Sequence, residues 1–196
     1  MTGDCMAKNT FYTRAGDEGY TGLLGPGRIP KEDARLEAVG TVDEANAVLG
    51  IARSLSRSPE APGSLLQIQR DLYGLMAELA ATPENAARFR SIDAQRVTWL
   101  ENQVDSLSGQ VEIPKEFIIP GDAVEGAFLD LARTVVRRAE RRVAELLHRG
   151  DISNPDLLRY LNRLSSYCFL LELRETLLAK HAAGVDHPNI TLAKNG

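Results

Sequence analysis

A short stretch of the sequence carries arginines at a spacing that suits anion binding. Arg133, Arg137 and Arg141 recur at every fourth residue, and Arg138 and Arg142 stand beside them. On a helix these positions form rows one turn apart, where like charges oppose helix formation by roughly 0.2–0.5 kcal/mol per pair. A bridging polyanion would instead contribute about 1.5–3 kcal/mol for each charge-assisted hydrogen bond. The pattern indicates a phosphate site, but a solvated basic face or a row paired with acids of another subunit explains it equally well.

A carboxylate on an earlier helical segment is a candidate partner for these arginines. Asp43 stands beside an apolar seam, in a row with Val39, Asn46 and Gly50. A charged group close to a core is costly unless it is paired, so we expect an ion pair with the arginine stretch. An ordinary aspartate on a helix face is the alternative that spacing leaves open.

Two further segments have the residue types of a ligand site. The segment from Thr13 to Gly22 is rich in glycine, and its backbone N–H groups could wrap phosphate. It is not a Walker A loop, because no Gly-Lys-Ser/Thr follows it. Asn162, Ser165 and Ser166 form a polar cluster in an apolar run, which suits either a ligand contact or an internal hydrogen-bond network.

Other chemistries find little support in the sequence. The three histidines, His148, His181 and His187, make no ligand pattern with Cys5 and Cys168, so no protein-bound metal site is expected. No Gly-x-Ser-x-Gly elbow and no Cys/His pair for nucleophilic catalysis is present. From the residues alone the sequence predicts an anion site and no particular reaction.

Helical periodicity governs the chain after its first thirty residues. Five glycines fall between Gly16 and Gly27, which predicts turns and loops there. Apolar seams then recur every three or four residues, with breakers at 58–63 and at Pro120-Gly121. We expect helices near residues 35–52, 64–81, 93–107, 123–148 and 155–180, without a long strand. The prediction is an all-α fold, a five-helix bundle (residues 35–182) between a glycine-rich arm (1–34) and a tail (183–196).

The bulk composition is that of an ordinary globular domain. The chain has 196 residues, 43% of them hydrophobic and 26% charged, with a net charge of −4. This charge provides no general attraction to nucleic acid or to an anionic membrane, so any anion site must be local. No apolar run approaches the roughly 20 residues of a membrane span, and no signal peptide is evident. With only Cys5 and Cys168 and no expected disulfide, we predict a cytoplasmic protein.

Five motifs in order give the chain a specific family resemblance. It resembles the PduO-type ATP:cob(I)alamin adenosyltransferases in segments that read TRAGDEG, RLEAVGTVDEAN, FIIPG, ARTVVRRAER and YLNRLS, at residues 13–19, 35–46, 117–121, 132–141 and 160–165. Together they cover about residues 12–170. Departures from the family pattern are Tyr20, Asp122 where glycine is usual, and Ser166 where aspartate is usual.

The resemblance implies a five-helix bundle that forms a homotrimer, with ATP between neighbouring subunits. Asp43 and Arg133 would pair near the corrin, and Phe117 would press on its lower face and exclude the lower axial ligand. The residues implied to hold ATP are Thr13, Arg14, Ala15, Gly16, Thr21, Gly22, Lys31, Arg137, Arg138, Glu140, Arg141 and Asn162.

The reaction implied by the resemblance is adenosyl transfer from ATP to cob(I)alamin. A four-coordinate Co(II) corrin accepts an electron more readily than a five-coordinate one. The resulting Co(I) attacks the ribose 5′ carbon, and triphosphate leaves, stabilised by the arginines and by Mg²⁺. A reductase and an adenosylcobalamin-dependent acceptor enzyme are implied partners. The competing hypotheses are a non-catalytic ATP- and cobalamin-binding delivery protein and a structural bundle whose arginines serve subunit contacts.

Overall fold

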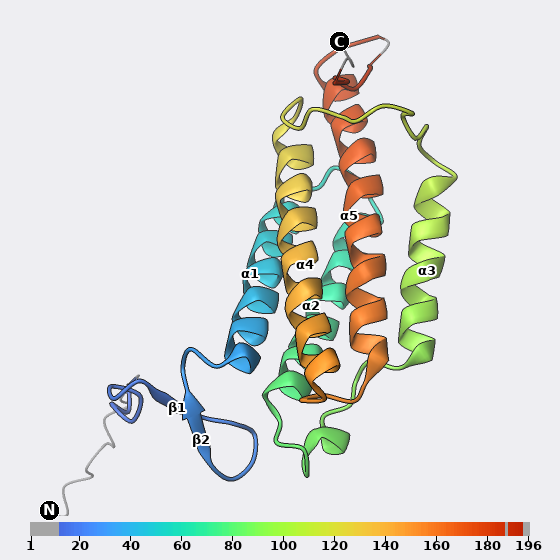
Figure 1. Cartoon of the computed structure of the whole chain (residues 1–196). Helices are drawn as coiled ribbons and strands as arrows, with labels where there is room; N and C mark the ends of the chain where they lie inside the picture. Colours follow the sequence, from blue (N-terminus) through green and yellow to red (C-terminus); the bar gives the residue numbers. More distant parts are fainter. Residues whose placement is uncertain (1–11, 187, 194–196) are drawn as a thin grey trace, which may run out of the picture.

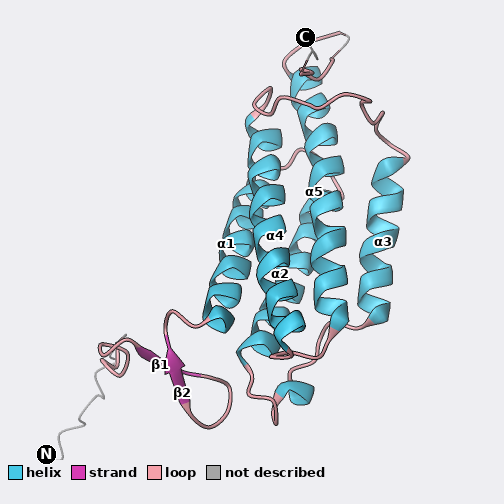
Figure 2. Cartoon of the chain, viewed as in Figure 1, coloured by secondary structure: helices cyan, strands magenta, loops and turns pink. Residues whose placement is uncertain are grey.

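Five helices make up most of the chain, preceded by a small hairpin. The computed structural model describes residues 12–186 and 188–193. The helices are α1 (Ala34–Leu55), α2 (Ala61–Ala80), α3 (Ala94–Ser108), α4 (Val124–Arg149) and α5 (Pro155–Ala182), with a short 3-10 helix at Ala86–Arg88. Strands β1 (Tyr20–Gly22) and β2 (Arg28–Pro30) pair antiparallel. The predicted all-α five-helix bundle is confirmed, and Figure 2 shows that strand is confined to this hairpin within the described residues.

In Figure 1, α4 lies between α1 and α5, α3 flanks α5, and α2 lies behind them, packed against α1. Their contact faces are the apolar seams of the sequence. Ala38, Val42 and Leu49 of α1 are completely buried, as are Val136 and Val143 of α4. Burial of each such side chain contributes about 1.5–3 kcal/mol, which holds the long helices together.

Local capping chemistry sets several helix ends. Asp33, Asp93 and Asn154 accept hydrogen bonds from backbone N–H groups in the first turns of α1, α3 and α5. Gly150 ends α4 in the left-handed conformation, with φ of 76°, as predicted. The expected breaker at 58–63 was wrong in part, because α2 starts at Ala61 and includes Pro62. Proline is compatible with the first turn of a helix, where its missing N–H has no partner to lose.

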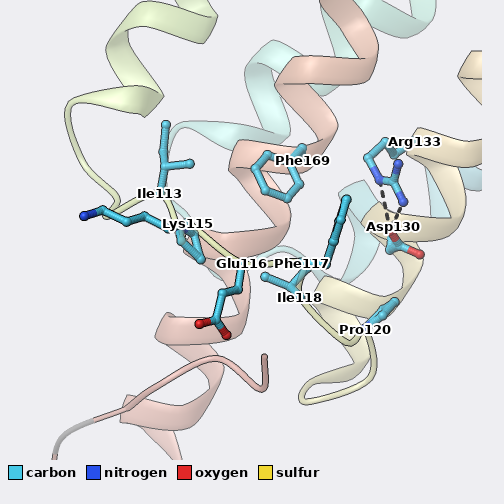
Figure 3. A pocket seen from close by; sticks show the side chains of 10 residues that line it. Ile113, Lys115, Glu116, Phe117, Ile118, Pro120, Asp130, Arg133 and Phe169 are labelled. Carbon is cyan, nitrogen blue, oxygen red and sulfur yellow. Dashed lines mark hydrogen bonds and ion pairs between the residues drawn. The ribbon is translucent and has the colours of Figure 1, made fainter. Parts of the chain in front are cut away.

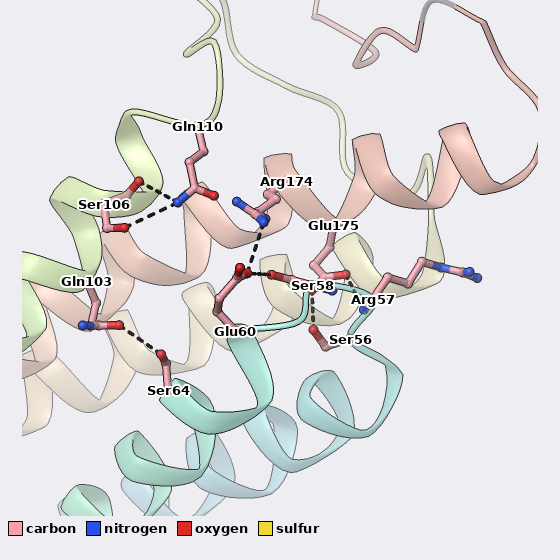
Figure 4. A network of polar contacts seen from close by, with 10 residues as sticks. All are labelled: Ser56, Arg57, Ser58, Glu60, Ser64, Gln103, Ser106, Gln110, Arg174 and Glu175. Atoms are coloured by element: carbon pink, nitrogen blue, oxygen red, sulfur yellow. Dashed lines mark hydrogen bonds and ion pairs between the residues drawn. The ribbon is translucent and has the colours of Figure 1, made fainter.

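Buried polar groups join the connections to the helices. Figure 4 shows Glu175 of α5 turned toward the α1–α2 connection, where Arg57 N and Ser58 N donate to its carboxylate at 2.8 and 3.1 Å. In the middle of the bundle, Tyr160 donates to Asp71 at 2.6 Å. These contacts satisfy charged groups that the core would otherwise leave unpaired.

The hairpin and the C-terminal tail lie at opposite ends of the bundle (Figure 1). The hairpin projects beyond the start of α1, and its loop is joined to the end of α2, where Leu24 N donates to Ala80 O at 2.8 Å. The tail lies beside the 109–123 connection between α3 and α4. Segments expected to share one ligand site are therefore far apart within a single chain.

Candidate functional site

The arginine row lies on α4 and divides into paired and unpaired members. Arg138 pairs with Glu44 of α1, and Arg142 lies 3.5 Å from both Glu37 and Glu145. Arg137 and Arg141 are exposed, and neither contacts a carboxylate among the described residues. Arg141 donates only to the backbone oxygen of Arg137, at 3.1 Å. Two adjacent guanidinium groups therefore remain available to an anion.

The polar residues predicted beside the row do come together. Asn162 of α5 donates to Glu140 of α4 at 2.8 Å. Its side-chain oxygen accepts from Arg163, also at 2.8 Å, and its backbone oxygen accepts from Ser165. These bonds orient the Asn162 amide and the Glu140 carboxylate next to the unpaired arginines.

Two hollows join into one groove beside the row. The first, of about 420 Å³, is lined by the 113–118 segment, Pro120, Asp130, Arg133 and Phe169 (Figure 3). The second, of about 430 Å³, lies between α3, α4 and α5 and includes Arg137, Ser165 and Ser166. Both are bordered by Ile113, Arg133 and Phe169. The groove therefore runs from an apolar end at Phe117 to a cationic end, where Arg133 and Arg137 outnumber the one carboxylate that lines the second hollow, Asp105.

Phe117 is 85% exposed, so it is not a core aromatic. Figure 3 shows its ring at the pocket, with Phe169 and the Arg133–Asp130 pair on the helices beyond it. Leaving a phenylalanine in water forgoes about 1.5–3 kcal/mol of burial. An exposed ring at the mouth of a mostly apolar hollow is suited to a large, flat ligand.

The expected ion pair between Asp43 and Arg133 does not form within the chain. Arg133 instead pairs with Asp130 of its own helix, at 2.6 Å. Asp43 is exposed, which corrects the expectation that it lies close to the core. It points away from the seam because it directly follows Val42, whose side chain occupies the buried face. The partner that sequence reasoning missed, Asp130, stands at the i, i+3 spacing typical of helical ion pairs.

A buried acid lies behind this pair. Burial, together with the nearby Asp130 carboxylate, raises the pKa of Glu172 to about 8, although Arg133 opposes the shift. Its Oε2 atom has no hydrogen-bond partner among the described residues. Burial also raises the pKa of the Cys168 thiol to about 12, so this cysteine is a poor nucleophile at neutral pH. Cys5 and His187 lie outside the described residues.

The predicted arm residues cluster in and beside the hairpin. Thr21 and Gly22 lie on β1, and Lys31 directly follows β2. A Cβ atom at Gly16 would lie 3.0 Å from Nζ of Lys31, so the amine lies against the arm backbone. The departure Tyr20 pairs with Pro30 in the hairpin register.

One turn of the arm is held by a residue that the sequence analysis missed. Arg28 donates to the backbone oxygens of Ala15 and Tyr20. Thr13 accepts from Ala15 N at 3.3 Å, and Arg14 has a φ of 60°. No hydrogen bond or ion pair among the described residues joins this arm to α4.

The described residues offer neither a metal cluster nor a membrane-spanning helix. Across residues 12–186 and 188–193, no three His, Cys, Asp or Glu side chains gather as a metal site. In the same part of the chain, no helix combines the length and apolar character needed to span a membrane.

Comparisons with known proteins agree on one family. A family model described as cobalamin adenosyltransferase matches residues 11–175. The corrinoid adenosyltransferase of Bacillus subtilis (strain 168) is 40% identical over 163 residues, covering 81% of this chain and 82% of that protein. Corrinoid adenosyltransferase PduO of Citrobacter freundii is 38% identical over 166 residues, covering 84% of this chain and 49% of that protein.

Solved structures extend the agreement to three dimensions. A variant of the PduO-type ATP:corrinoid adenosyltransferase from Lactobacillus reuteri, complexed with cobalamin and ATP, superposes with a TM-score of 0.81 and 32% identity. The match covers 95% of this chain and all of that one. Another variant, complexed with ATP, matches with a TM-score of 0.78, also at 32% identity, over 94% of this chain and all of that one.

Proposed function

This chain belongs to the cobalamin adenosyltransferase family, and we propose that it transfers the 5′-deoxyadenosyl group of ATP to cob(I)alamin or a related corrinoid, giving adenosylcobalamin and triphosphate. The observation that carries the proposal is the groove that joins exposed Phe117 to unpaired Arg137. Its apolar end suits a corrin and its cationic end suits a triphosphate, so the two reactants would meet along one face of α4 and α5.

At the cationic end, Arg137 and Arg141 contact the triphosphate, with Arg138, Glu140 and Asn162 beside them. Their positive charge stabilises the negative charge that grows on triphosphate as the C5′–O bond breaks. Among the described residues neither Arg137 nor Arg141 forms an ion pair, so no such pair has to be broken there when ATP binds. Mg²⁺ accompanies the triphosphate, held mainly by phosphate oxygens and water, as is usual for this ion, and it adds positive charge there.

At the apolar end, Phe117 faces the lower side of the corrin and excludes the lower axial ligand. Losing that ligand lowers the energy of the orbital that receives the electron, which favours reduction of Co(II) to Co(I). The Co(I) electron pair then forms the bond to C5′ while triphosphate leaves with the C5′–O pair. Exposure of 85% supports this role, because Phe117 is available to a ligand without unfolding anything.

The arm and Asp43 complete the site from a neighbouring copy of the chain. Thr13, Arg14, Ala15, Gly16, Thr21, Gly22 and Lys31 bind the nucleotide from the arm. Because the hairpin stands beyond one end of the bundle (Figure 1), it would reach the α4 arginines of a neighbour more readily than its own. The exposed Asp43 likewise reaches a guanidinium across the interface near the corrin, where Arg133 supplies one.

The assembly consistent with this sharing is a homotrimer, with one site at each interface. ATP should order the arm against the neighbouring bundle. Analytical ultracentrifugation, combined with an activity assay, tests this assembly. A fully active monomer would contradict it.

A non-catalytic protein that binds and delivers ATP and cobalamin would keep the same groove, and turnover separates the two functions. The test is to mix protein, ATP, Mg²⁺ and chemically reduced cobalamin without oxygen and to follow the corrin absorbance. Conversion to adenosylcobalamin with release of triphosphate supports the enzyme, whereas binding without conversion contradicts it. In the cell, we propose a cytoplasmic enzyme that receives electrons from a reductase and supplies an adenosylcobalamin-dependent acceptor.

A further inference from the structure

The C-terminal tail pairs with the backbone that begins at the carbonyl of Phe117 and continues through Ile118 to Ile119. Ala193 N donates to Phe117 O at 2.7 Å, and Ile119 N donates to Thr191 O at 2.8 Å. Between these bonds, Ile118 and Leu192 form an antiparallel bridge. A phenylalanine whose side chain is mostly in water is thus fixed through its main chain.

One carboxylate connects this pairing to the helical bundle. Asp122 accepts from Thr191 twice, from the backbone N at 2.8 Å and from Oγ1 at 2.7 Å. It also accepts from Lys180 Nζ of α5 at 2.9 Å. Lys180 in turn donates to Asn189 O, at 2.5 Å. Asp122 therefore links the Phe117 segment, the tail and the last turns of α5.

The environment of Asp122 favours its charged form. Burial alone would raise the pKa of this carboxyl, but the hydrogen bonds from Lys180 and Thr191 together outweigh burial and lower the pKa below its usual value. Charge-assisted hydrogen bonds are roughly twice as strong as neutral ones. The hydrogen bonds from Lys180 and Thr191 to Asp122 are therefore intact at neutral pH. A glycine at this position could not accept them, because it has no side chain.

We propose that Asp122 is a positioning residue, which clamps the 188–193 segment against residues 117–119 and so holds Phe117 in place for the corrin. This inference rests on the proposed function. A ring that must keep a ligand off the cobalt face has to stay within a fraction of an ångström of its working position, and preorganised backbone supplies that restraint. Packing around the Phe117 side chain cannot supply this restraint, because the side chain is 85% exposed.

The test uses the full chain with Asp122→Ala and Thr191→Val, and with Asp186→Ala as the matched control. Asp186 is an exposed tail carboxylate without a hydrogen bond or ion pair among the described residues. The first measurement is amide hydrogen exchange at Ile119 and Ala193. Exchange should accelerate about tenfold or more in Asp122→Ala, the factor expected when charge-assisted bonds are lost, and less in Thr191→Val, which keeps its backbone N–H.

The second measurement is functional and compares two rates in each variant. One is adenosylation of cob(II)alamin under a mild reductant, and the other is adenosylation of cobalamin already reduced to Co(I). The proposal predicts that the ratio of the first rate to the second falls in Asp122→Ala, together with the four-coordinate signal of bound Co(II), while calorimetric ATP affinity is kept. Asp186→Ala should match the wild type in all of these.

The outcomes separate this inference from the proposed function. Unchanged exchange in Asp122→Ala would overturn the clamp, and faster exchange with an unchanged rate ratio and signal would overturn its role in placing Phe117. If Asp122→Ala loses thermal stability, Thr191→Val, which removes only a surface hydroxyl contact, provides the same comparison. A wild-type protein that converts no Co(I)alamin would instead overturn the proposed function, whatever the exchange data show.

Discussion

In the described part of the chain, the charged groups around Asp71 are paired in the interior of the bundle, but those on the open face of α4 are partly unpaired. In the interior, Asp71 accepts from Tyr160 at 2.6 Å and from Arg96 at 2.7 Å, so that each member has a partner. On the open face, Arg137 and Arg141 have no carboxylate among the described residues. The Asp71 carboxylate is thus paired within the chain, whereas the arginines assigned to ATP are left to be paired by a ligand.

Two aromatic residues show the same division. Tyr160 is completely buried and its hydroxyl is hydrogen-bonded, while Phe117 is 85% exposed on a loop. One adds to the free energy of unfolding and the other adds little. Stability and function should therefore respond to different substitutions, and the predictions below test that separation.

Glu172 is a buried carboxyl inside the bundle with an unpartnered oxygen among the described residues, and it should make stability depend on pH. Its pKa is raised from 4.5 to about 8 in the folded chain. Stability is then fully present below pH 4.5 and falls as pH rises toward 8, by up to about 1.4 kcal/mol per pH unit, because only the unfolded carboxyl ionises freely. Glu172→Gln should flatten this dependence in urea unfolding from pH 5 to 8.

The control for Glu172 is Glu112→Gln, which alters an exposed carboxylate that makes no ion pair among the described residues. It should keep the wild-type slope. Parallel stability curves for wild type and Glu172→Gln would show that the buried acid finds a partner in solution.

Removing a member of the Asp71 network should lower the free energy of unfolding nearly as much as ionisation of the unfolded-state Glu172 carboxyl does. Arg96 donates to Asp71 and lies 3.9 Å from the centre of the Trp99 ring. Arg96→Ala leaves a buried carboxylate without its positive partner, which should reduce the free energy of unfolding by about 3 kcal/mol. Arg159→Ala breaks an exposed pair with Asp156 and should cost less than about 1 kcal/mol. Equal losses in urea unfolding would erase the proposed distinction.

The smallest stability effect is expected at Phe117. Phe117→Ala should change the free energy of unfolding by less than about 0.5 kcal/mol, as for most surface positions. A core phenylalanine would cost about 3–5 kcal/mol. The same variant should greatly slow adenosylation of cob(II)alamin under a mild reductant and lose the four-coordinate Co(II) signal. A folded variant that keeps that signal would rule the role out.

Local patterns were enough to predict the helices and a candidate anion site on α4, whereas most residues of the proposed ATP and corrin sites came from the family resemblance. The locally predicted features depend on residues that are close in sequence. Periodicity predicts the apolar seams that contain Val42 and Val136. The backbone preference of glycine predicts the end of α4 at Gly150. The assignment of Glu140 and Asn162 to the ATP site came from the family resemblance, and in the structure Asn162 donates to Glu140 beside the arginine row.

The missed features depend on contacts between distant segments. The tail contacts the Phe117 segment through hydrogen bonds between residues more than seventy positions apart, and no sequence pattern near Thr191 predicts these bonds. Asp43 was misjudged because it follows buried Val42 by one residue, a rotation of about 100° around the helix that is enough to turn its side chain from the core to solvent. The hairpin strands have three residues each, too few for alternation to be recognised.

The most direct test of the account is a pair of calorimetric ATP titrations. Arg137→Ala removes an arginine that forms no ion pair in the part of the chain that the structure describes, and Arg142→Ala removes one from the same helix that lies near Glu37 and Glu145. We predict that Arg137→Ala weakens ATP binding by about 1.5–3 kcal/mol, the value of a charge-assisted contact, and that Arg142→Ala changes it little. Unchanged affinity in Arg137→Ala, with the protein folded, would contradict the assignment of the open α4 face to ATP.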